Sequence, residues 1–209
     1  MPYIGHGPIT SKKIIAVEGP DDDKFFDALL RYMSITDFDI RFVGGTGEFQ
    51  NKLPNLKKTS GFLYADGSSF VTHLAIIRDE NGDNAFSSVS NILKREGFTP
   101  PESHGQFSDA NPKVGIFIMP GKTVQGTMLE DLCLKTVEKH PAMKCVNEFV
   151  YCVSALETKP KNISKAKAQT FLAAQYDLVK SVGLGAQKNY WDFDSSALNE
   201  LKQFLSYLK

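Results

Sequence analysis

Cysteine and histidine are scarce in this sequence, and neither is spaced as metal ligands usually are. The three cysteines, Cys133, Cys145 and Cys152, form no Cys-x-x-Cys pair, and their odd number fits no complete disulfide framework. The four histidines are scattered without the spacing of zinc ligands. We therefore expect no zinc site and a reducing, cytoplasmic compartment.

Long apolar runs are also lacking. No stretch of the 209 residues is long and apolar enough to span a bilayer, and residues 1–13 lack the hydrophobic region of a signal peptide. Apolar residues make up 42% of the chain and charged residues 23%, as in ordinary globular proteins. The sequence thus predicts a globular protein without a membrane partner, and its length suits one large α/β domain or one domain with an appendage.

The sequence also lacks an excess of either charge, because it has 24 basic and 24 acidic residues. Proteins that bind nucleic acid through phosphates usually carry a basic face, so neutrality lowers that expectation. The distribution is nevertheless uneven: residues 18–48 hold eight acidic and three basic residues, and residues 157–190 hold six lysines and two acidic residues. An acidic metal centre beside a lysine-rich segment would suit a metal-bound phosphate, although solvated helix faces would give the same counts.

What the sequence does contain is an alternation of short apolar runs and amphipathic segments. The runs typical of buried strands are residues 13–18, 40–43, 73–78 and 113–119. Helical patterns cover residues 20–33, 48–58, 85–96, 127–139, 146–156, 164–180 and 196–208. This alternation predicts a mainly parallel sheet with helices on both faces. We expect an α/β core over residues 1–145 and a helical C-terminal extension, residues 146–209, packed on it as part of one domain.

Acidic clusters follow three of these strands. Glu18–Asp21 follows the first strand, Asp79–Asp83 follows the third, and Glu130–Asp131 comes after the fourth strand and a glycine-flanked loop. In parallel sheets, ligands bind outside the carboxyl ends of the strands. Carboxylates gathered there repel one another unless a cation joins them, and hard oxygen ligands suit Mg²⁺ or Mn²⁺. The pattern therefore predicts a metal site.

Each cluster taken alone also has a purely structural explanation. Glu18 could be a solvated strand end, with Asp21–Asp23 complementing the dipole of the helix that follows. Asp79–Asp83 has the composition of a polar turn. Glu130 and Asp131 would be favoured near a helix N-terminus by the same dipole effect. The recurrence of acidic residues after successive strands is what favours the metal site.

Two of these motifs resemble the Toprim domain. Val17-Glu18-Gly19-x-Asp21 with Phe25-Phe26, and the strand leading into Asp79-x-Asn81-x-Asp83, are similar to its Glu after strand one and its Asp-x-Asp after strand three. Topoisomerases, bacterial primases and OLD-family nucleases share this Rossmann-like fold. Residues 116–132 and 165–194 are similar to a bacterial Toprim-related family of unknown function. Together these passages cover nearly the whole chain.

The resemblance implies metal-dependent phosphoryl transfer, foremost by a Toprim-type nuclease acting on DNA or RNA with Mg²⁺ or Mn²⁺. It implies nucleic acid as a partner and allows a partner ATPase. Glu18 would be a ligand or general acid/base, and one of Lys161, Lys165 and Lys167, foremost the last two, would neutralise transition-state charge. Glu130, with Asp131 beside it, matches the extra acidic position of OLD-type nucleases. The implied metal ligands are Glu18, Asp79, Asn81, Asp83, Glu130 and Asp131.

One position departs from the family pattern. Asn81 stands where the second carboxylate of Asp-x-Asp belongs, and an amide oxygen can bind a cation but brings no charge. Asp83 could supply the missing carboxylate from the next turn. The alternative is a catalytically degenerate Toprim-like domain that serves as a binding or interaction module. Asn81 favours this alternative, whereas four retained acidic residues favour the enzyme: Glu18, Asp79, Asp83 and Glu130.

Overall fold

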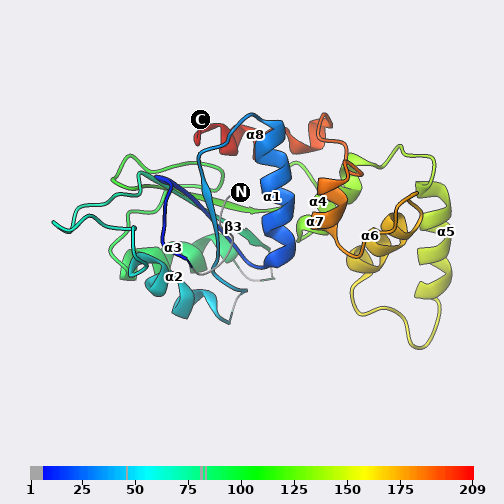
Figure 1. The fold of residues 1–209 in the computed structure, drawn as a ribbon. Coiled ribbons are helices and arrows are strands. Elements are labelled where there is room, and N and C mark those ends of the chain that lie inside the picture. Colours follow the sequence, from blue (N-terminus) through cyan, green and yellow to red (C-terminus); the bar gives the residue numbers. More distant parts are fainter. Residues whose placement is uncertain (1–6, 46, 81, 83) are drawn as a thin grey trace.

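The computed structural model describes residues 7–45, 47–80, 82 and 84–209 (Figure 1). In this part of the chain, a four-stranded parallel sheet has the order β2-β1-β3-β4. The strands are β1 (Lys13–Val17), β2 (Asp39–Phe42), β3 (His73–Asp79) and β4 (Lys113–Met119). The α/β class and the central parallel sheet with a helical C-terminal region are confirmed.

Eight α-helices and one 3₁₀ helix lie within the described residues. They are α1 (Pro20–Tyr32), α2 (Phe49–Lys57), α3 (Ala85–Arg95), α4 (Leu129–Thr136), α5 (Met143–Ser154), α6 (Ile163–Ala173), α7 (Val182–Gln187), η1 (Ser196–Leu198) and α8 (Asn199–Ser206). The prediction of one helix over residues 164–180 is wrong beyond Ala173. The chain leaves the helix there, and α7 forms separately after it.

Alternate residues of the strands build two apolar clusters, one on each face of the sheet. In β1, Ile15 and Val17 join the cluster that includes α1, α4 and α8, while Ile14 and Ala16 join the cluster that includes α2 and α3. All four side chains are fully buried. Because successive side chains of a strand point to opposite faces, this apolar run requires helices on both sides of the sheet.

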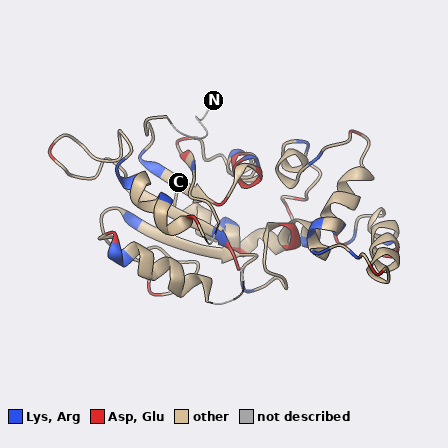
Figure 2. Ribbon diagram, turned by 90° about the horizontal axis from the view of Figure 1, so that it is seen from below, with Lys and Arg blue, Asp and Glu red and all other residues tan. Residues whose placement is uncertain are grey.

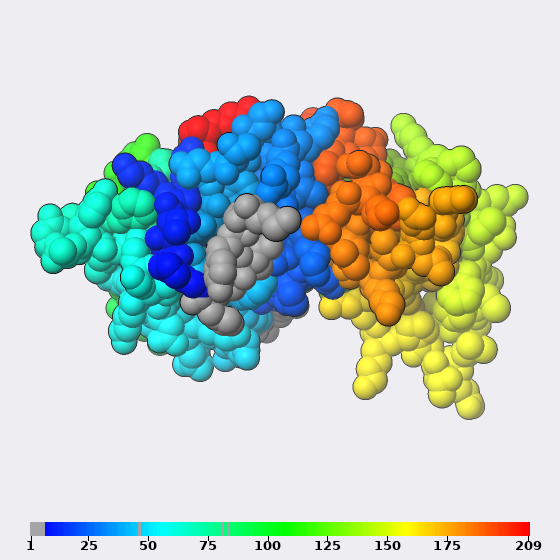
Figure 3. All heavy atoms as spheres, viewed as in Figure 1, coloured from blue at the N-terminus to red at the C-terminus, as the bar shows by residue number. Residues whose placement is uncertain are grey.

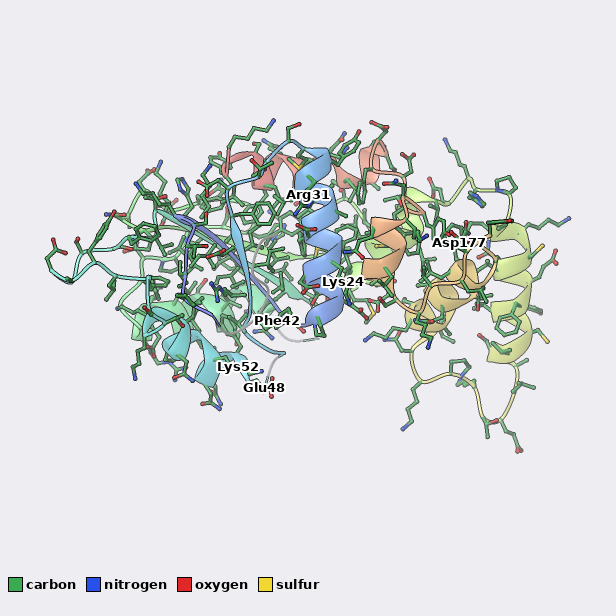
Figure 4. The ribbon with its side chains drawn as sticks, in the orientation of Figure 1. Lys24, Arg31, Phe42, Glu48, Lys52 and Asp177 are labelled. Carbon is green, nitrogen blue, oxygen red and sulfur yellow. The ribbon has the colours of Figure 1, made fainter. Side chains whose placement is uncertain are left out.

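The short helix α7 packs closely against α1. A Cβ at Gly183 would lie 2.3 Å from the backbone oxygen of Asp21 and 2.8 Å from Cβ of Lys24, which Figure 4 labels on α1. Trp191 continues this contact region: its Nε1 donates to the carbonyl of Val182 over 2.8 Å, and its ring stacks on Phe171 of α6. Trp191, which lies in the segment 165–194 that resembles the Toprim-related family, thus contacts both α6 and α7.

Helices α5 and α6 project beside the core, and the chain then returns to it (Figure 3). On α8, Phe204 packs 5.4 Å from Phe117 of β4 between ring centroids. Glu200 accepts hydrogen bonds from the backbone N–H groups of Lys122 and Thr123, in the loop after β4. Residues on both sides of position 145 therefore share one apolar cluster, and the predicted division into core and extension stays a prediction.

None of the helices in the described ranges combines the length and apolar character that crossing a bilayer requires.

Candidate metal-binding site at the sheet edge

Three predicted site residues lie where parallel strands end. Glu18 directly follows β1, Asp79 is the last residue of β3, and Glu130 is the second residue of α4, after β4. A small cavity of about 10 Å³, the room of one water-sized sphere, opens at this edge. Its lining comes from the residue after β1 and from α1, β3 and β4: Glu18, Asp22, Phe26, Ile77, Arg78, Asp79 and Met119.

Asp79 is the most perturbed carboxyl group of this edge. Burial, together with the negative charges of Asp22, Glu18 and Glu130, raises its pKa from 3.8 to about 8. A hydrogen bond of 3.1 Å from the backbone N–H of Leu129 to Oδ1 of Asp79 acts in the opposite direction. The same bond ties the end of β3 to the first turn of α4, which brings Glu130 into range of Asp79.

Asp22 belongs to this site although the sequence did not single it out as a ligand. Burial, together with the negative charges of Glu18, Glu130 and Asp21, raises its pKa from 3.8 to about 7. Its Oδ2 accepts the backbone N–H of Gly19 over 2.9 Å. The sequence analysis assigned Asp22 to the helix dipole. The signal that could have found it is its place only four residues after Glu18, close to the end of the first strand.

Two basic side chains, Arg78 and Lys165, contact carboxylates of this edge. Nε of Arg78 donates to Oε1 of Glu18 over 3.1 Å, and the guanidinium lies over the Phe49 ring, with the Arg78 side chain only 2% exposed. Nζ of Lys165 lies 3.9 Å from Oε1 of Glu130, but its side chain is 59% exposed, so water screens this pair. Elsewhere, acidic and basic segments are interspersed over the ribbon (Figure 2).

Asp131, Lys161 and Lys167 do not line this cavity. Oδ2 of Asp131 accepts the backbone N–H groups of Thr127 (2.8 Å) and Met128 (3.2 Å), which stabilises the start of α4. Gly126, at φ +134°, approaches so closely that a Cβ there would lie 2.3 Å from the Asp131 carboxylate. The Gly126–Asp131 spacing thus has a structural role. A role of Asp131 in metal binding stays a prediction, as do catalytic roles of Lys161, which is exposed, and Lys167.

Asn81 and Asp83 lie outside the described residues. Within the described ranges, no three His, Cys, Asp or Glu side chains form a group that could hold a metal ion by themselves. The donor chemistry nevertheless fits Mg²⁺ or Mn²⁺: Glu18, Asp22 and Asp79 offer only hard oxygens, and Asp22 and Asp79 are buried beside other negative charges. The described residues thus supply the ligand type without a complete ligand set.

Comparison with known families and structures adds to this geometry. The model described as "Protein of unknown function (DUF3226)" matches residues 12–209. The chain belongs to this family. None of the curated proteins matches its sequence.

Two solved structures are distantly similar to this member of the family. The C-terminal region of the Burkholderia pseudomallei OLD protein is 13% identical, with a TM-score of 0.48 over 96% of this chain and 100% of that chain. A hypothetical protein from Pyrococcus horikoshii OT3 is 16% identical, with a TM-score of 0.43 over 94% of each chain. Both likenesses are too distant to assign a function.

Proposed function

We propose that this protein is a Toprim-type, Mg²⁺- or Mn²⁺-dependent phosphodiesterase acting on DNA or RNA. The observation that carries the proposal is the meeting of Glu18, Asp22 and Asp79 in one small cavity at the carboxyl edge of a parallel sheet. Ligand sites in open α/β sheets lie at this edge. Like-charged carboxylates held together there destabilise the fold unless a cation or a proton neutralises them. The Glu18-Gly19 and Asp79-x-Asn81 motifs support the same proposal through their resemblance to Toprim.

The side chains divide into three roles. Glu18, Asp22 and Asp79 would hold the cation, with Glu130, Asn81 and Asp83 completing its ligands. A divalent cation bound there would supply charge neutralisation and a water molecule of lowered pKa. Arg78 fixes the orientation of the Glu18 carboxylate through its 3.1 Å hydrogen bond. Lys165, exposed and close to Glu130, would approach the phosphate and neutralise charge that develops on it.

A second candidate is a binding module that has lost catalysis. Two observations favour it: the neutral Asn81 replaces a carboxylate, and the described residues alone do not form a metal-binding group. In such a module, the buried carboxyl groups would remain protonated near neutral pH, as the raised pKa values of Asp22 and Asp79 allow in the absence of a cation. The two candidates differ in whether metal binding and cleavage occur at this edge.

A cleavage assay separates the two candidates. Purified protein is incubated with single- and double-stranded DNA and RNA in millimolar Mn²⁺ or Mg²⁺, with EDTA as the metal-free reference. We expect cleavage that EDTA abolishes, and a loss of about 10²- to 10⁴-fold in Glu18→Gln, because this swap removes the charge of a general acid/base. Asp22→Asn and Asp79→Asn should also lose activity, whereas Asp109→Asn, at an exposed position near the start of β4, should retain it.

Asn81→Asp tests the departure from the family pattern. Restoring the carboxylate should tighten metal binding and increase cleavage if metal occupancy limits the native protein. If neither the wild type nor Asn81→Asp cuts any of these nucleic acids with either metal, the enzyme proposal is wrong and the binding module is the better account.

A further inference from the structure

A second and larger cavity lies next to the acidic edge. This α4–α6 cleft, of about 470 Å³, is formed by α4, α5, α6 and the loop before α4, and its lining is Thr123, Val124, Gln125, Asp131, Leu134, Lys135, Glu138, Met143, Asn147, Ile163, Ser164 and Lys167. Its volume falls within the roughly 300–1,000 Å³ typical of small-molecule sites. The Glu130–Lys165 contact joins it to the acidic edge, since Asp131 follows Glu130, and Ser164 and Lys167 flank Lys165 along the chain.

The cleft has an apolar floor and a polar rim. Val124, Leu134 and Met143 are buried beneath it, with Ile163 at its edge. Hydroxyl and amide groups of the rim come from Thr123, Gln125, Asn147 and Ser164. An apolar floor with a few converging polar groups suits an amphipathic ligand that has one apolar part and one polar part.

Of the two lysines that line the cleft, one is available to bind a ligand. Lys135 forms an ion pair with Glu138, and an oxygen of Asp131 is used by the two backbone N–H groups before α4. For Lys167, which is half-buried, no ion pair is found within the described ranges. Ser164 and Lys167 line the cleft from the same helix, three residues apart, so a hydroxyl and an ammonium face the same space. This pair favours an anionic group, and phosphate is the anion that a neighbouring phosphodiesterase site would present.

We infer that the α4–α6 cleft binds one nucleotide, with its phosphate on Lys167 and its base or sugar on the apolar floor. Lys167 is then a substrate-binding residue rather than the catalytic residue that the sequence predicted. The cleft determines how a strand is placed, because a nucleotide held there positions the neighbouring phosphodiester at the Glu18–Asp79 edge. That this nucleotide belongs to the substrate rests on the proposed function, whereas nucleotide binding by the cleft can be measured without it.

Isothermal titration with adenosine 5′-monophosphate in EDTA tests the inference on the whole chain. We expect the wild type to bind it, and Lys167→Met to weaken binding about tenfold or more, as for the loss of one charge-assisted hydrogen bond. Asn147→Asp, which adds a negative charge to the rim, should weaken it similarly. Lys94→Met removes an exposed lysine of α3, on the other face of the sheet from the cleft, and should leave affinity unchanged. Thermal unfolding checks that each variant is folded.

Two further ligands define the contacts. Adenosine should bind at least about tenfold more weakly than the monophosphate because it lacks the group that Lys167 binds. Inorganic phosphate should also bind more weakly, because it leaves the apolar floor uncovered. The inference is overturned if Lys167→Met and the wild type bind equally, if neither binds, or if either of these two ligands binds as tightly as the monophosphate.

Asp79→Asn separates this inference from the proposed function. It should abolish cleavage and retain monophosphate binding, whereas Lys167→Met should raise KM for an oligonucleotide more than it lowers kcat. A protein that binds the monophosphate in this pattern but never cleaves nucleic acid keeps its cleft assignment and loses the proposed activity. A protein that cleaves without Lys167-dependent binding keeps the activity and loses the cleft assignment.

Discussion

Two buried aspartates of the same sheet, Asp39 and Asp79, differ in the groups that surround their carboxylates. Asp39 begins β2 and is surrounded by donors: Oδ2 accepts the backbone N–H groups of Thr10 (2.8 Å) and Ser11 (3.2 Å) and lies 3.2 Å from Nη2 of Arg41. Asp79 ends β3 and accepts one backbone N–H, and the charges that shift its pKa are those of the carboxyl groups of Asp22, Glu18 and Glu130. The amino end of the sheet thus neutralises a buried charge within the fold, and the carboxyl end leaves that neutralisation to a proton or a cation.

This difference separates structural from functional burial of charge. A buried carboxylate that is fully paired stabilises one conformation and is costly to disturb. A buried carboxylate whose neighbours repel it lowers stability, and such groups are frequent where a ligand is expected. The comparison therefore predicts opposite consequences for the same substitution, Asp to Asn, at the two ends of the sheet.

The largest effect on stability is expected for Asp39→Asn. The variant removes the negative charge that faces the guanidinium of Arg41, which is 3% exposed and also donates to the carbonyls of Gly7 and Pro8. We expect a loss of about 3–5 kcal/mol in the free energy of unfolding, the range for breaking a buried ion pair from one side. Urea unfolding at pH 7 measures it. A loss below about 1 kcal/mol would remove the contrast between the two aspartates.

Asp79→Asn should instead stabilise the metal-free protein at alkaline pH. The folded pKa of about 8 lies above the ordinary 3.8, so the contribution of Asp79 is fully present below pH 3.8 and is lost as pH rises through about 8. The gain of Asp79→Asn over the wild type should therefore grow from pH 5 to pH 9. It should reach the order of a few kcal/mol, since one pKa unit corresponds to about 1.4 kcal/mol.

Unfolding in EDTA at several pH values measures this gain. Asp109→Asn, at an exposed position, is the control and should follow the wild type at every pH. A destabilisation of Asp79→Asn that is the same at pH 5 and pH 9 would contradict the raised pKa.

A smaller loss of stability is expected for a substitution of Asp131, the residue after Glu130. Asp131→Ala removes the acceptor for the N–H groups of Thr127 and Met128 and should cost about 1 kcal/mol, as the loss of a helix cap does. This loss should not change when Mn²⁺ is added. Thermal unfolding with and without Mn²⁺ checks both points, and a loss that depends on the metal would show that Asp131 is a ligand after all.

The smallest effect on stability is expected for Lys165→Met. The pair with Glu130 is long and the lysine is exposed, so the free energy of unfolding should change by less than about 0.5 kcal/mol. Cleavage should fall although stability does not, because the lysine acts on substrate. Comparing kcat and urea midpoints of the same preparation separates the two. A variant with full activity would exclude Lys165 from the chemistry.

The strands and the edge at which the acidic residues meet could be predicted from the sequence. Runs such as residues 14–17 are apolar at every position, which only a sheet covered on both faces explains, and parallel strands place their carboxyl ends together. Asp79 and Glu18 followed from this rule alone. Lys165 came instead from the resemblance, since nothing local in α6 indicates that it reaches Glu130.

The parts that were not predicted depend on tertiary contacts. Asp22 was hidden because an acidic residue in the first turn of a helix already has a sufficient local reason. Helix α7 was missed because its six residues include two glycines, and its formation depends on the close contact of Gly183 with α1. Arg78 is only the last residue of the strand-like run 73–78 in the sequence, and its burial beside Glu18 and over Phe49 is visible only in the folded chain.

The account is tested most directly by titrating Mn²⁺ into the wild type and Asp79→Asn at pH 6, 7 and 8. Because burial and neighbouring carboxylates raise the pKa values of Asp22 to about 7 and of Asp79 to about 8, cation binding must displace protons. The predicted result is an affinity of the wild type that increases with pH, proton release at pH 7, and much weaker binding by Asp79→Asn. Equal binding by the two proteins, or no binding by the wild type at any pH, would contradict a metal site at this edge.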